Sequence, residues 1–287
     1  MIFADKCIII KKKDFGGLIM SNKKIGFIGA GNMATAIING MIGNKAKEPS
    51  MIYVFDLDAD KLNIMKQKGV NACASANEAV EKSDIIVLAV KPQNYEEVLL
   101  GIKSSVTAEK VFVTIAAGIS ISYVTETLGV NCPAVRVMPN TPLLLGYGAT
   151  AMCRSENISD EDFNEIYKMF SLSGEVCLFP ESKMNEVISI NGSSPAYFYL
   201  FALAMKQYAE EAGFDGETAL KLIAKTMEGS AHMILESGDS LETLIQKVSS
   251  KGGTTIAALD VMKSKGIPEA IKEGMAACTK RAEELGK

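Results

Sequence analysis

The chain has 287 residues, of which 48% are hydrophobic and 22% are charged, and its formal net charge is −4. This acidity argues against a nucleic-acid or anionic-membrane surface, because neutralising phosphates requires clustered lysines and arginines. We therefore expect a small-molecule partner, and no apolar run approaches the ~20 residues that a membrane span needs. A chain of this length can form two domains that each bury a core.

The six cysteines are scattered without a C-x-x-C pair, and His232 is the only histidine. A tetrahedral metal site needs closely spaced soft ligands, and a disulfide framework needs a short, cysteine-rich chain. We therefore predict no metal site and a reducing, cytoplasmic location. His232 lies in a helical segment without a nucleophile pattern, which favours a structural or surface role.

The first 19 residues differ in character from the rest. Ile8-Ile9-Ile10 precedes Lys11-Lys12-Lys13, the reverse of the charge order in a secretion signal. Gly16-Gly17 corresponds to codons compatible with a bacterial ribosome-binding sequence shortly before Met20. We therefore expect translation to begin at Met20 and residues 1–19 to be a non-native leader.

A strand, a glycine turn and a helix follow. Residues 24–28 form a short apolar run, and residues 33–42 have helical spacing. Between them lies the dinucleotide fingerprint G-x-G-x-x-A, whose glycines allow a tight turn and close approach of the pyrophosphate, while the small third residue packs the helix. The cofactor-binding residues assigned here are Gly29, Gly31, Asn32, Met33 and Ala34.

The second strand, residues 51–55, ends at Asp56. An acidic residue in this position accepts hydrogen bonds from the adenine ribose 2′-hydroxyl and repels a 2′-phosphate. Alternatively, Asp56 or Asp58 caps the next helix, which runs to Lys68. We expect NADPH or NADH as the cofactor, with a slight preference for NADH based on Asp56.

Further strands, at residues 70–73, 85–90, 111–115 and 134–138, alternate with helices. This alternation indicates a parallel sheet that is covered on both faces, with cofactor-binding loops at the carboxyl ends of its strands. From these loops we assign to the cofactor Asn77, Ala89, Val90, Lys91, Pro92, Ala116, Ala117 and Gly118. After a last strand at 175–179 the first domain, residues 20–180, ends.

Residues 181–287 contain only helical patterns, with helices expected at 195–212, 217–236, 240–248, 255–265 and 268–285. The first of these has Ser194 as its N-cap, Pro195 in its first turn and Gly213 after its end, and it is apolar on nearly every face. Such a helix is buried all round, which so small a domain cannot achieve alone. We therefore predict a homo-oligomer, at least a dimer, through this half.

The predicted fold class is thus an α/β Rossmann-type N-terminal domain with a mostly parallel sheet, followed by an all-α dimerisation domain. In the second half, a glycine-threonine step precedes the helix at 255–265. Two glycines and two threonines at a helix start leave several backbone N–H groups pointing at one spot, which suits a carboxylate or phosphate. The step consists of Gly252, Gly253, Thr254 and Thr255.

The chain resembles the pyrroline-5-carboxylate reductase family in five segments, which occur in the family's order at 29–34, 90–93, 136–142, 192–197 and 249–259. The likeness extends from Lys24 to the C-terminus. The sequence departs from the usual pattern at Ser194, where the family has glycine, and at Lys251, where it has proline. Ser194 is a better N-cap than glycine, whereas Lys251 adds a cation beside the expected carboxylate site or faces solvent.

The resemblance implies that the chain reduces 1-pyrroline-5-carboxylate to L-proline, the last step of proline biosynthesis. It places the substrate carboxylate on the backbone N–H groups of Gly253, Thr254 and Thr255 and on the Ser250 hydroxyl, with Gly252 in the same loop. In this interpretation the hydroxyl of Thr255, the catalytic residue, orients the ring nitrogen, and the cofactor supplies the hydride.

Two other functions remain open. A 3-hydroxy-acid dehydrogenase of the same layout would use a lysine such as Lys225 or Lys247 as its acid/base, but would leave the glycine-threonine step unexplained. A non-catalytic NAD(P)-binding sensor would bind the cofactor without turnover. Oxidation of 3-hydroxy acids with NAD would favour the first alternative.

Overall fold

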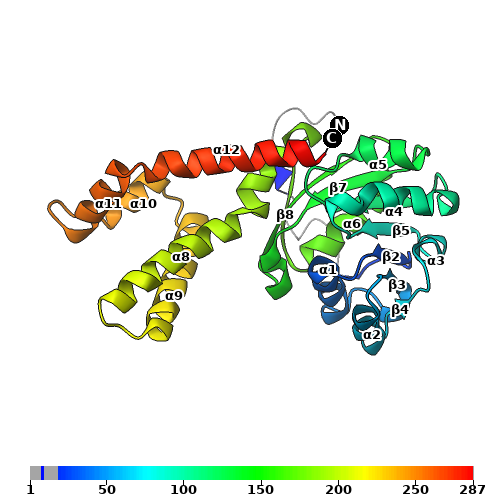
Figure 1. The fold of residues 1–287 in the computed structure, drawn as a ribbon, viewed down its shortest axis with the longest axis horizontal. Coiled ribbons are helices and arrows are strands. Elements are labelled where there is room, and N and C mark those ends of the chain that lie inside the picture. The colour runs from blue at the N-terminus through cyan, green and yellow to red at the C-terminus, as the bar shows by residue number, and fades with distance from the viewer. Residues whose placement is uncertain (1–7, 10–18, 287) are drawn as a thin grey trace. The chain divides into compact units, whose positions relative to one another are not determined.

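The computed structural model describes residues 8–9 and 19–286 (Figure 1). Its contacts divide the described chain into two compact units, which are considered separately below. The first unit comprises Met1–Ser193 and Cys278–Lys287, and the second comprises Ser194–Ala277. The domain boundary expected at residue 180 remains a prediction. The expected leader lies outside the described residues, apart from 8–9 and 19.

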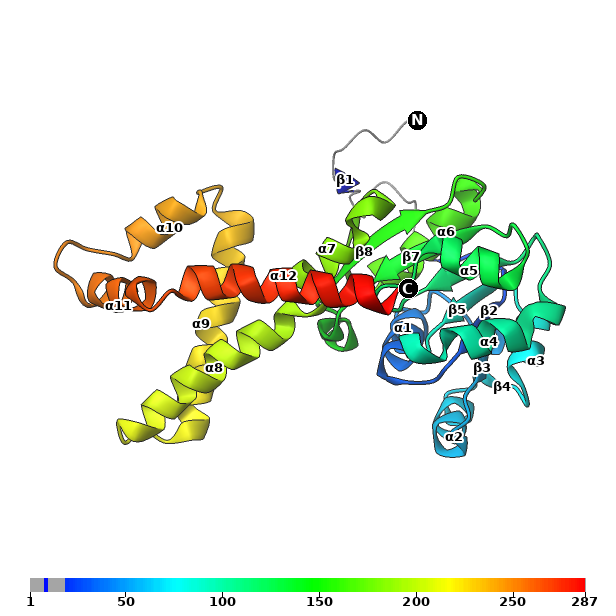
Figure 2. The same ribbon diagram turned by 45° about the horizontal axis from the view of Figure 1, so that its top comes forward.

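Within the described residues, a nine-stranded sheet forms the centre of the first unit (Figure 2). Its order is β1-β9-β8-β7-β6-β5-β2-β3-β4. The strands are β1 (Ile8–Ile9), β2 (Ile25–Ile28), β3 (Ile52–Phe55), β4 (Asn71–Ala72), β5 (Ile85–Leu88), β6 (Val111–Thr114), β7 (Ala134–Met138), β8 (Gly148–Arg154) and β9 (Gly174–Leu178).

The six strands from β2 to β7 pair in parallel in the order β4-β3-β2-β5-β6-β7. This is the strand order of a dinucleotide-binding fold, in which the chain reverses direction across the sheet between β2 and β5. Strand β8 pairs antiparallel with β7 and parallel with β9, and β1 pairs antiparallel with β9. The prediction of a mostly parallel sheet is confirmed.

Strand β8 is absent from the sequence-based prediction. Its residues are GATAMCR, and glycine and alanine are depleted in strands. Burial decides the structure instead, because Ala151 and Met152 are almost inaccessible to solvent and pair across to β7. Tertiary pairing therefore overrides a weak local preference here.

Helices cover both faces of this sheet. They are α1 (Asn32–Gly43), α2 (Ala59–Gln67), α3 (Ala76–Glu81), α4 (Tyr95–Ile102), α5 (Ile121–Leu128), α6 (Asp160–Ser171) and α7 (Met184–Val187). Short helical turns occur at η2 (Pro49–Met51), η3 (Pro92–Asn94), η4 (Lys103–Ser105), η5 (Thr141–Leu145) and η6 (Glu181–Lys183), and a π-helical turn, η7, spans Ile188–Gly192.

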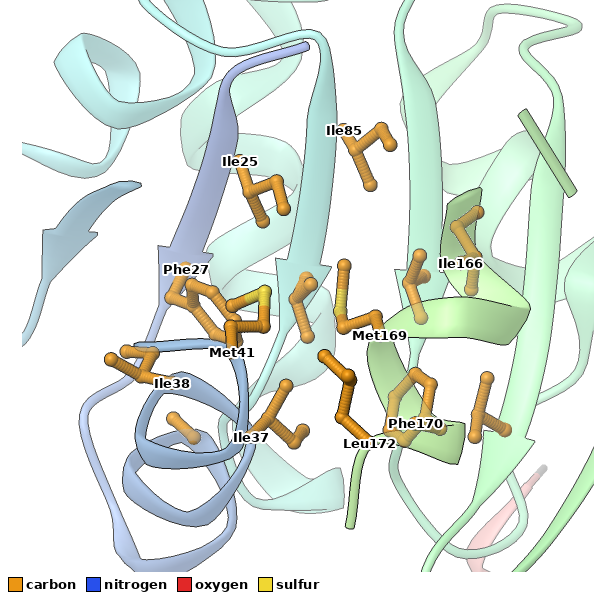
Figure 3. Close-up of a cluster of buried hydrophobic side chains, with 14 of the residues drawn as sticks. Ile25, Phe27, Ile37, Ile38, Met41, Ile85, Ile166, Met169, Phe170 and Leu172 are labelled. Atoms are coloured by element: carbon orange, nitrogen blue, oxygen red, sulfur yellow. The ribbon is translucent and has the colours of Figure 1, made fainter. Parts of the chain in front are cut away.

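Two apolar clusters lie on opposite faces of the sheet, because successive side chains of a strand point to opposite sides. Ile25 and Phe27 of β2 belong to one cluster, whereas Ile28 belongs to the other. Figure 3 shows the first cluster, in which side chains of α1 and α6, among them Ile37 and Met169, pack against β2 and β5. This packing fixes the carboxyl ends of the central strands.

The second unit is helical, with α8 (Ser194–Glu211), α9 (Gly216–Glu236), α10 (Leu241–Lys247), α11 (Thr254–Ser264) and part of α12 (Ile267–Leu285). All five helices lie close to their predicted positions, and Gly213 has the expected positive φ of 86°. Helix α8 begins at Ser194 itself, and Ser193 before it already has helical backbone angles. The role of Ser194 as an N-cap therefore stays a prediction.

Helix α8 is not buried within a single chain, as its apolar sequence in so small a domain predicts. Tyr199 is 63%, Leu200 66% and Tyr208 73% exposed. Beside it, two apolar hollows of about 380 and 620 Å³ are lined by α8, α9, α11 and α12. Among the described residues, no helix is both long and apolar enough to cross a membrane.

Candidate active site

The glycine turn between β2 and α1 contains two glycines, which have no side chains that would keep other groups away from its backbone. Gly29 has a φ of +102°, and a Cβ atom there would lie 2.6 Å from the carbonyl oxygen of Ala89 at the end of β5. Gly31 is the N-cap of α1, and a Cβ atom on it would meet only open space. No side chain among the described residues caps α1. The first N–H groups of a helix lack intrahelical partners, so this turn can hold an anion.

Asp56 supports this turn from the end of β3. Its Oδ2 accepts a hydrogen bond from the Ala30 N–H at 2.7 Å, and its Oδ1 accepts one from the Asp58 N–H at 2.9 Å. The N-cap of α2 is Asp58, which accepts from the N–H groups of Asp60 and Lys61. These bonds, led by the one from the Lys61 backbone, lower the pKa of Asp58. The capping role therefore belongs to Asp58.

A pocket of about 530 Å³ opens beside the turn, at the carboxyl ends of β2 and β5. This is the reversal point of the sheet, where such folds bind their ligands. Of the predicted cofactor residues, the pocket wall contains Gly29, Gly31, Asp56, Asn77, Ala89, Val90 and Lys91. It does not contain Asn32, Met33, Ala34, Pro92, Ala116, Ala117 or Gly118.

Several residues of this pocket were missed by the sequence analysis. Leu57 is 94% exposed and stands at the rim with Lys61, whereas Val98 and Ile102 of α4 form part of the wall. The apolar spacing of α4 indicates one face of a helix but not which ligand it meets. Leu57 gives no signal either, because single apolar residues on a protein surface are common.

Asn77 lines the pocket, but its side-chain amide already makes hydrogen bonds to other residues of the chain. The Nδ2 group donates to the carbonyl oxygen of Gly101 at 3.0 Å, and Oδ1 accepts from the Ser105 hydroxyl at 2.8 Å. Asn77 thus ties α3 to the end of α4. Its side chain shapes the pocket wall through this connection.

The loop at 116–118 lies against the last turns of α12. Gly118 has a φ of +82°, and a Cβ atom on it would lie 2.4 Å from the carbonyl oxygen of Ala282. A side chain on Gly286 would likewise collide with the carbonyl oxygen of Gly118, at 2.2 Å. Gly118 is therefore required for packing against the C-terminal residues of the first unit.

Two asparagines join β7, β8 and η7. The Oδ1 of Asn140 accepts from the Ala149 N–H at 2.9 Å, and its Nδ2 donates to the Asn191 carbonyl at 3.2 Å. In return, Nδ2 of Asn191 donates to the carbonyl oxygens of Met138 and Ala149 at 2.8 and 2.9 Å. The segment 136–142 thus fixes the chain just before it enters α8.

In the second unit the glycine-threonine step forms a turn that leads into α11. Gly252 has a φ of +73°, Gly253 is the N-cap, and no side chain among the described residues caps the helix. The Gly253 N–H donates to the carbonyl oxygen of Ser250 at 2.9 Å. This leaves the N–H groups of Thr254 and Thr255, in the first turn of α11, as the donors facing an incoming anion.

A Rossmann strand order and an open glycine turn together define an oxidoreductase that uses NADH or NADPH. Residues 24–118 match the family described as "NADP oxidoreductase coenzyme F420-dependent". Residues 181–285 match the family described as "Pyrroline-5-carboxylate reductase dimerisation". The pyrroline-5-carboxylate reductase of Escherichia coli (strain K12) is 38% identical over 266 residues, which cover 92% of this chain and 99% of that protein. The chain belongs to the pyrroline-5-carboxylate reductase family.

Solved structures agree with this assignment. A pyrroline-5-carboxylate reductase from Coxiella burnetii superposes with a TM-score of 0.83 at 34% identity, covering 93% of this chain and all of that one. The Plasmodium falciparum pyrroline carboxylate reductase with NADP bound superposes with a TM-score of 0.86 at 27% identity, again over 93% of this chain and 100% of that one. The predicted family and fold class are confirmed.

Proposed function

We propose that the chain reduces 1-pyrroline-5-carboxylate to L-proline with a hydride from NADH or NADPH. The observation that carries this proposal is the 38% identity to a reductase of which 99% is covered, so that both halves of that enzyme are represented. The two anion-accepting helix starts, at α1 and α11, support it because the cofactor and the substrate both carry negative charge.

The first unit fits the cofactor. The open space at Gly31 leaves room for a pyrophosphate against the first N–H groups of α1, which belong to Asn32, Met33 and Ala34. The loops at 89–92 and 116–118 follow β5 and β6 and would hold the nicotinamide end. When bound there, the cofactor supplies the hydride, and the chain positions it.

The charges around Asp56 support a preference for NADH. Asp56 and Asp58 both face the Lys61 ammonium group, whose Nζ lies 3.7 Å from Asp56 and 3.4 Å from Asp58. A 2′-phosphate would meet a net negative charge there, whereas a ribose hydroxyl can donate to the remaining lone pairs of the Asp56 carboxylate. The cofactor preference thus depends on whether Lys61 remains paired.

The substrate would be held by α11. The N–H groups of Thr254 and Thr255, with the Ser250 hydroxyl, would bind its carboxylate, and the Thr255 hydroxyl would orient the ring nitrogen. The imine carbon must then face nicotinamide C4. A protonated imine is already electrophilic, so these residues need to supply position rather than a strong general acid.

The exposed apolar surface of α8 supports a homo-oligomer, at least a dimer, formed through residues 181–285. Burying these side chains removes apolar area from water, which is the main favourable term in association. The cysteines described by the structure are free thiols, which supports a reducing cytoplasm as the site of action.

The test follows the initial rates of NADH and NADPH oxidation separately, with pyrroline-5-carboxylate as substrate. We expect turnover with formation of proline. Cofactor binding without turnover would instead indicate the sensor, and oxidation of 3-hydroxy acids with NAD would indicate the dehydrogenase. Either result would contradict the proposal.

A further inference from the structure

Tyr95 carries a buried hydroxyl at the carboxyl ends of β5 and β6. It is the first residue of α4 and is only 1% exposed. The hydroxyl donates to the carbonyl oxygen of Leu88 at 2.7 Å and lies 3.0 Å from Oγ1 of Thr114. The hydroxyl therefore joins the last residue of β5 to the last residue of β6.

Burial raises the pKa of Tyr95, so the phenol is neutral and can donate and accept at the same time. Because its one proton goes to the Leu88 carbonyl, its oxygen accepts from the Thr114 hydroxyl. A phenylalanine would fill the same apolar cluster equally well. Packing alone therefore does not explain why the residue at this position carries a hydroxyl.

The position of this hydroxyl in the sheet is informative. Leu88 and Thr114 are the last paired residues of the β5–β6 ladder. Beyond them the two strands continue as the loops 89–92 and 115–118, where sheet pairing no longer holds them together. Residues Ala89, Val90 and Lys91 of the first loop line the 530 Å³ pocket. The Tyr95 hydroxyl connects the two strands at the point where the ladder ends and the two loops begin.

We propose that Tyr95 is a positioning residue for the reaction, whose hydroxyl sets the spacing of the loops 89–92 and 115–118 around the nicotinamide end of the cofactor. This inference rests on the proposed function, in which these loops hold that end. Removing the hydroxyl leaves the Leu88 carbonyl and the Thr114 hydroxyl buried without this partner, and such groups move to find new ones. The spacing between the two loops is then no longer set by this hydroxyl.

The test compares Tyr95→Phe with a matched control, Tyr167→Phe, in the full-length chain. Tyr167 is 2% exposed and lies on α6 in the other apolar cluster, so both variants delete one buried phenolic oxygen. Both should lose thermal stability. Only Tyr95→Phe should weaken direct binding of NADH by about tenfold and lower kcat, while the KM for pyrroline-5-carboxylate at saturating cofactor stays unchanged.

A second variant keeps the test decisive if Tyr95→Phe does not fold. Thr114→Val removes the partner hydroxyl while keeping the shape of the side chain, and it should change NADH binding in the same direction by a smaller factor. Equal NADH affinity and kcat in Tyr95→Phe and Tyr167→Phe would overturn the proposal. Because NADH binding is measured without substrate, failure of the wild-type chain to reduce pyrroline-5-carboxylate would refute the proposed function separately.

Discussion

The two units differ in how fully a single chain buries their apolar side chains. In the first unit, residues such as Ile25, Phe27 and Ile85 are completely buried between the sheet and its helices. In the second, only three of the described residues are buried, namely Pro195, Ala219 and Ile223. The cofactor-binding half is thus complete within one chain, whereas the helical half needs further surfaces. Substitutions in the first unit should therefore act on the chain itself, and those in α8 on association.

The largest effect should come from Thr255→Ala, which separates the chemical roles of the two units. Losing the hydroxyl that we propose orients the ring nitrogen should lower kcat by about 10²- to 10⁴-fold, the range for a lost orienting or acid/base group. NADH binding should not change, because the proposed cofactor site lies in the first unit. Thr254→Ala is the control, since Thr254 is assigned only a backbone contact. Equal losses in both variants would contradict the role of Thr255.

Next in size, Leu200→Asp should dissociate the oligomer. The substitution would bury a carboxylate in an apolar contact, which costs several kcal/mol unless the charge finds a partner. Size-exclusion chromatography with light scattering should show monomers at concentrations where the wild type is associated. Ile64→Asp on α2, which is 50% exposed in the first unit, should leave the mass unchanged. An unchanged mass for Leu200→Asp would show that the contact lies elsewhere.

A smaller effect, confined to the first unit, is expected from Glu165→Gln. Glu165 lies 3.1 Å from Lys47, and their side chains are 5% and 2% exposed. Removing one charge of a buried pair costs about 3 kcal/mol, because the other is left without compensation. Urea unfolding should show this loss of unfolding free energy, whereas Lys61→Met, at an exposed pair, should change it by less than about 1 kcal/mol. A change in oligomer mass with Glu165→Gln would break the proposed division between the units.

The smallest change concerns cofactor choice. Asp56→Asn keeps an acceptor for the glycine turn and removes one negative charge, so the ratio of kcat/KM for NADH to that for NADPH should fall by about tenfold. Lys61→Met should move the ratio in the opposite direction, because it removes the cation. Parallel rate measurements with the two cofactors decide this. A ratio that stays constant in both variants would mean that these charges do not distinguish the 2′-hydroxyl of NADH from the 2′-phosphate of NADPH.

Local patterns predicted most of the fold. The glycine turn, the central strands and all five helices of the second unit have short-range signals, such as the spacing after Gly29 or the positive φ that Gly213 provides. Strand β8 was not predicted because its residues have a weak preference for strands, and only its pairing with β7 makes it a strand. The sequence could not reveal that Asp56 serves the glycine turn or that Tyr95 reaches β6, because both bonds join residues far apart in the chain.

The contact of Gly118 with the end of α12 affects how the protein is made. A growing chain leaves the ribosome from its N-terminus, and domains usually fold as they emerge. Here the first unit includes Cys278–Lys287, and Ala282 packs against the loop that follows β6. The cofactor-binding unit therefore cannot finish folding during synthesis of its own strands. It has to wait until the whole helical half has been translated and the last turns of α12 are free to dock.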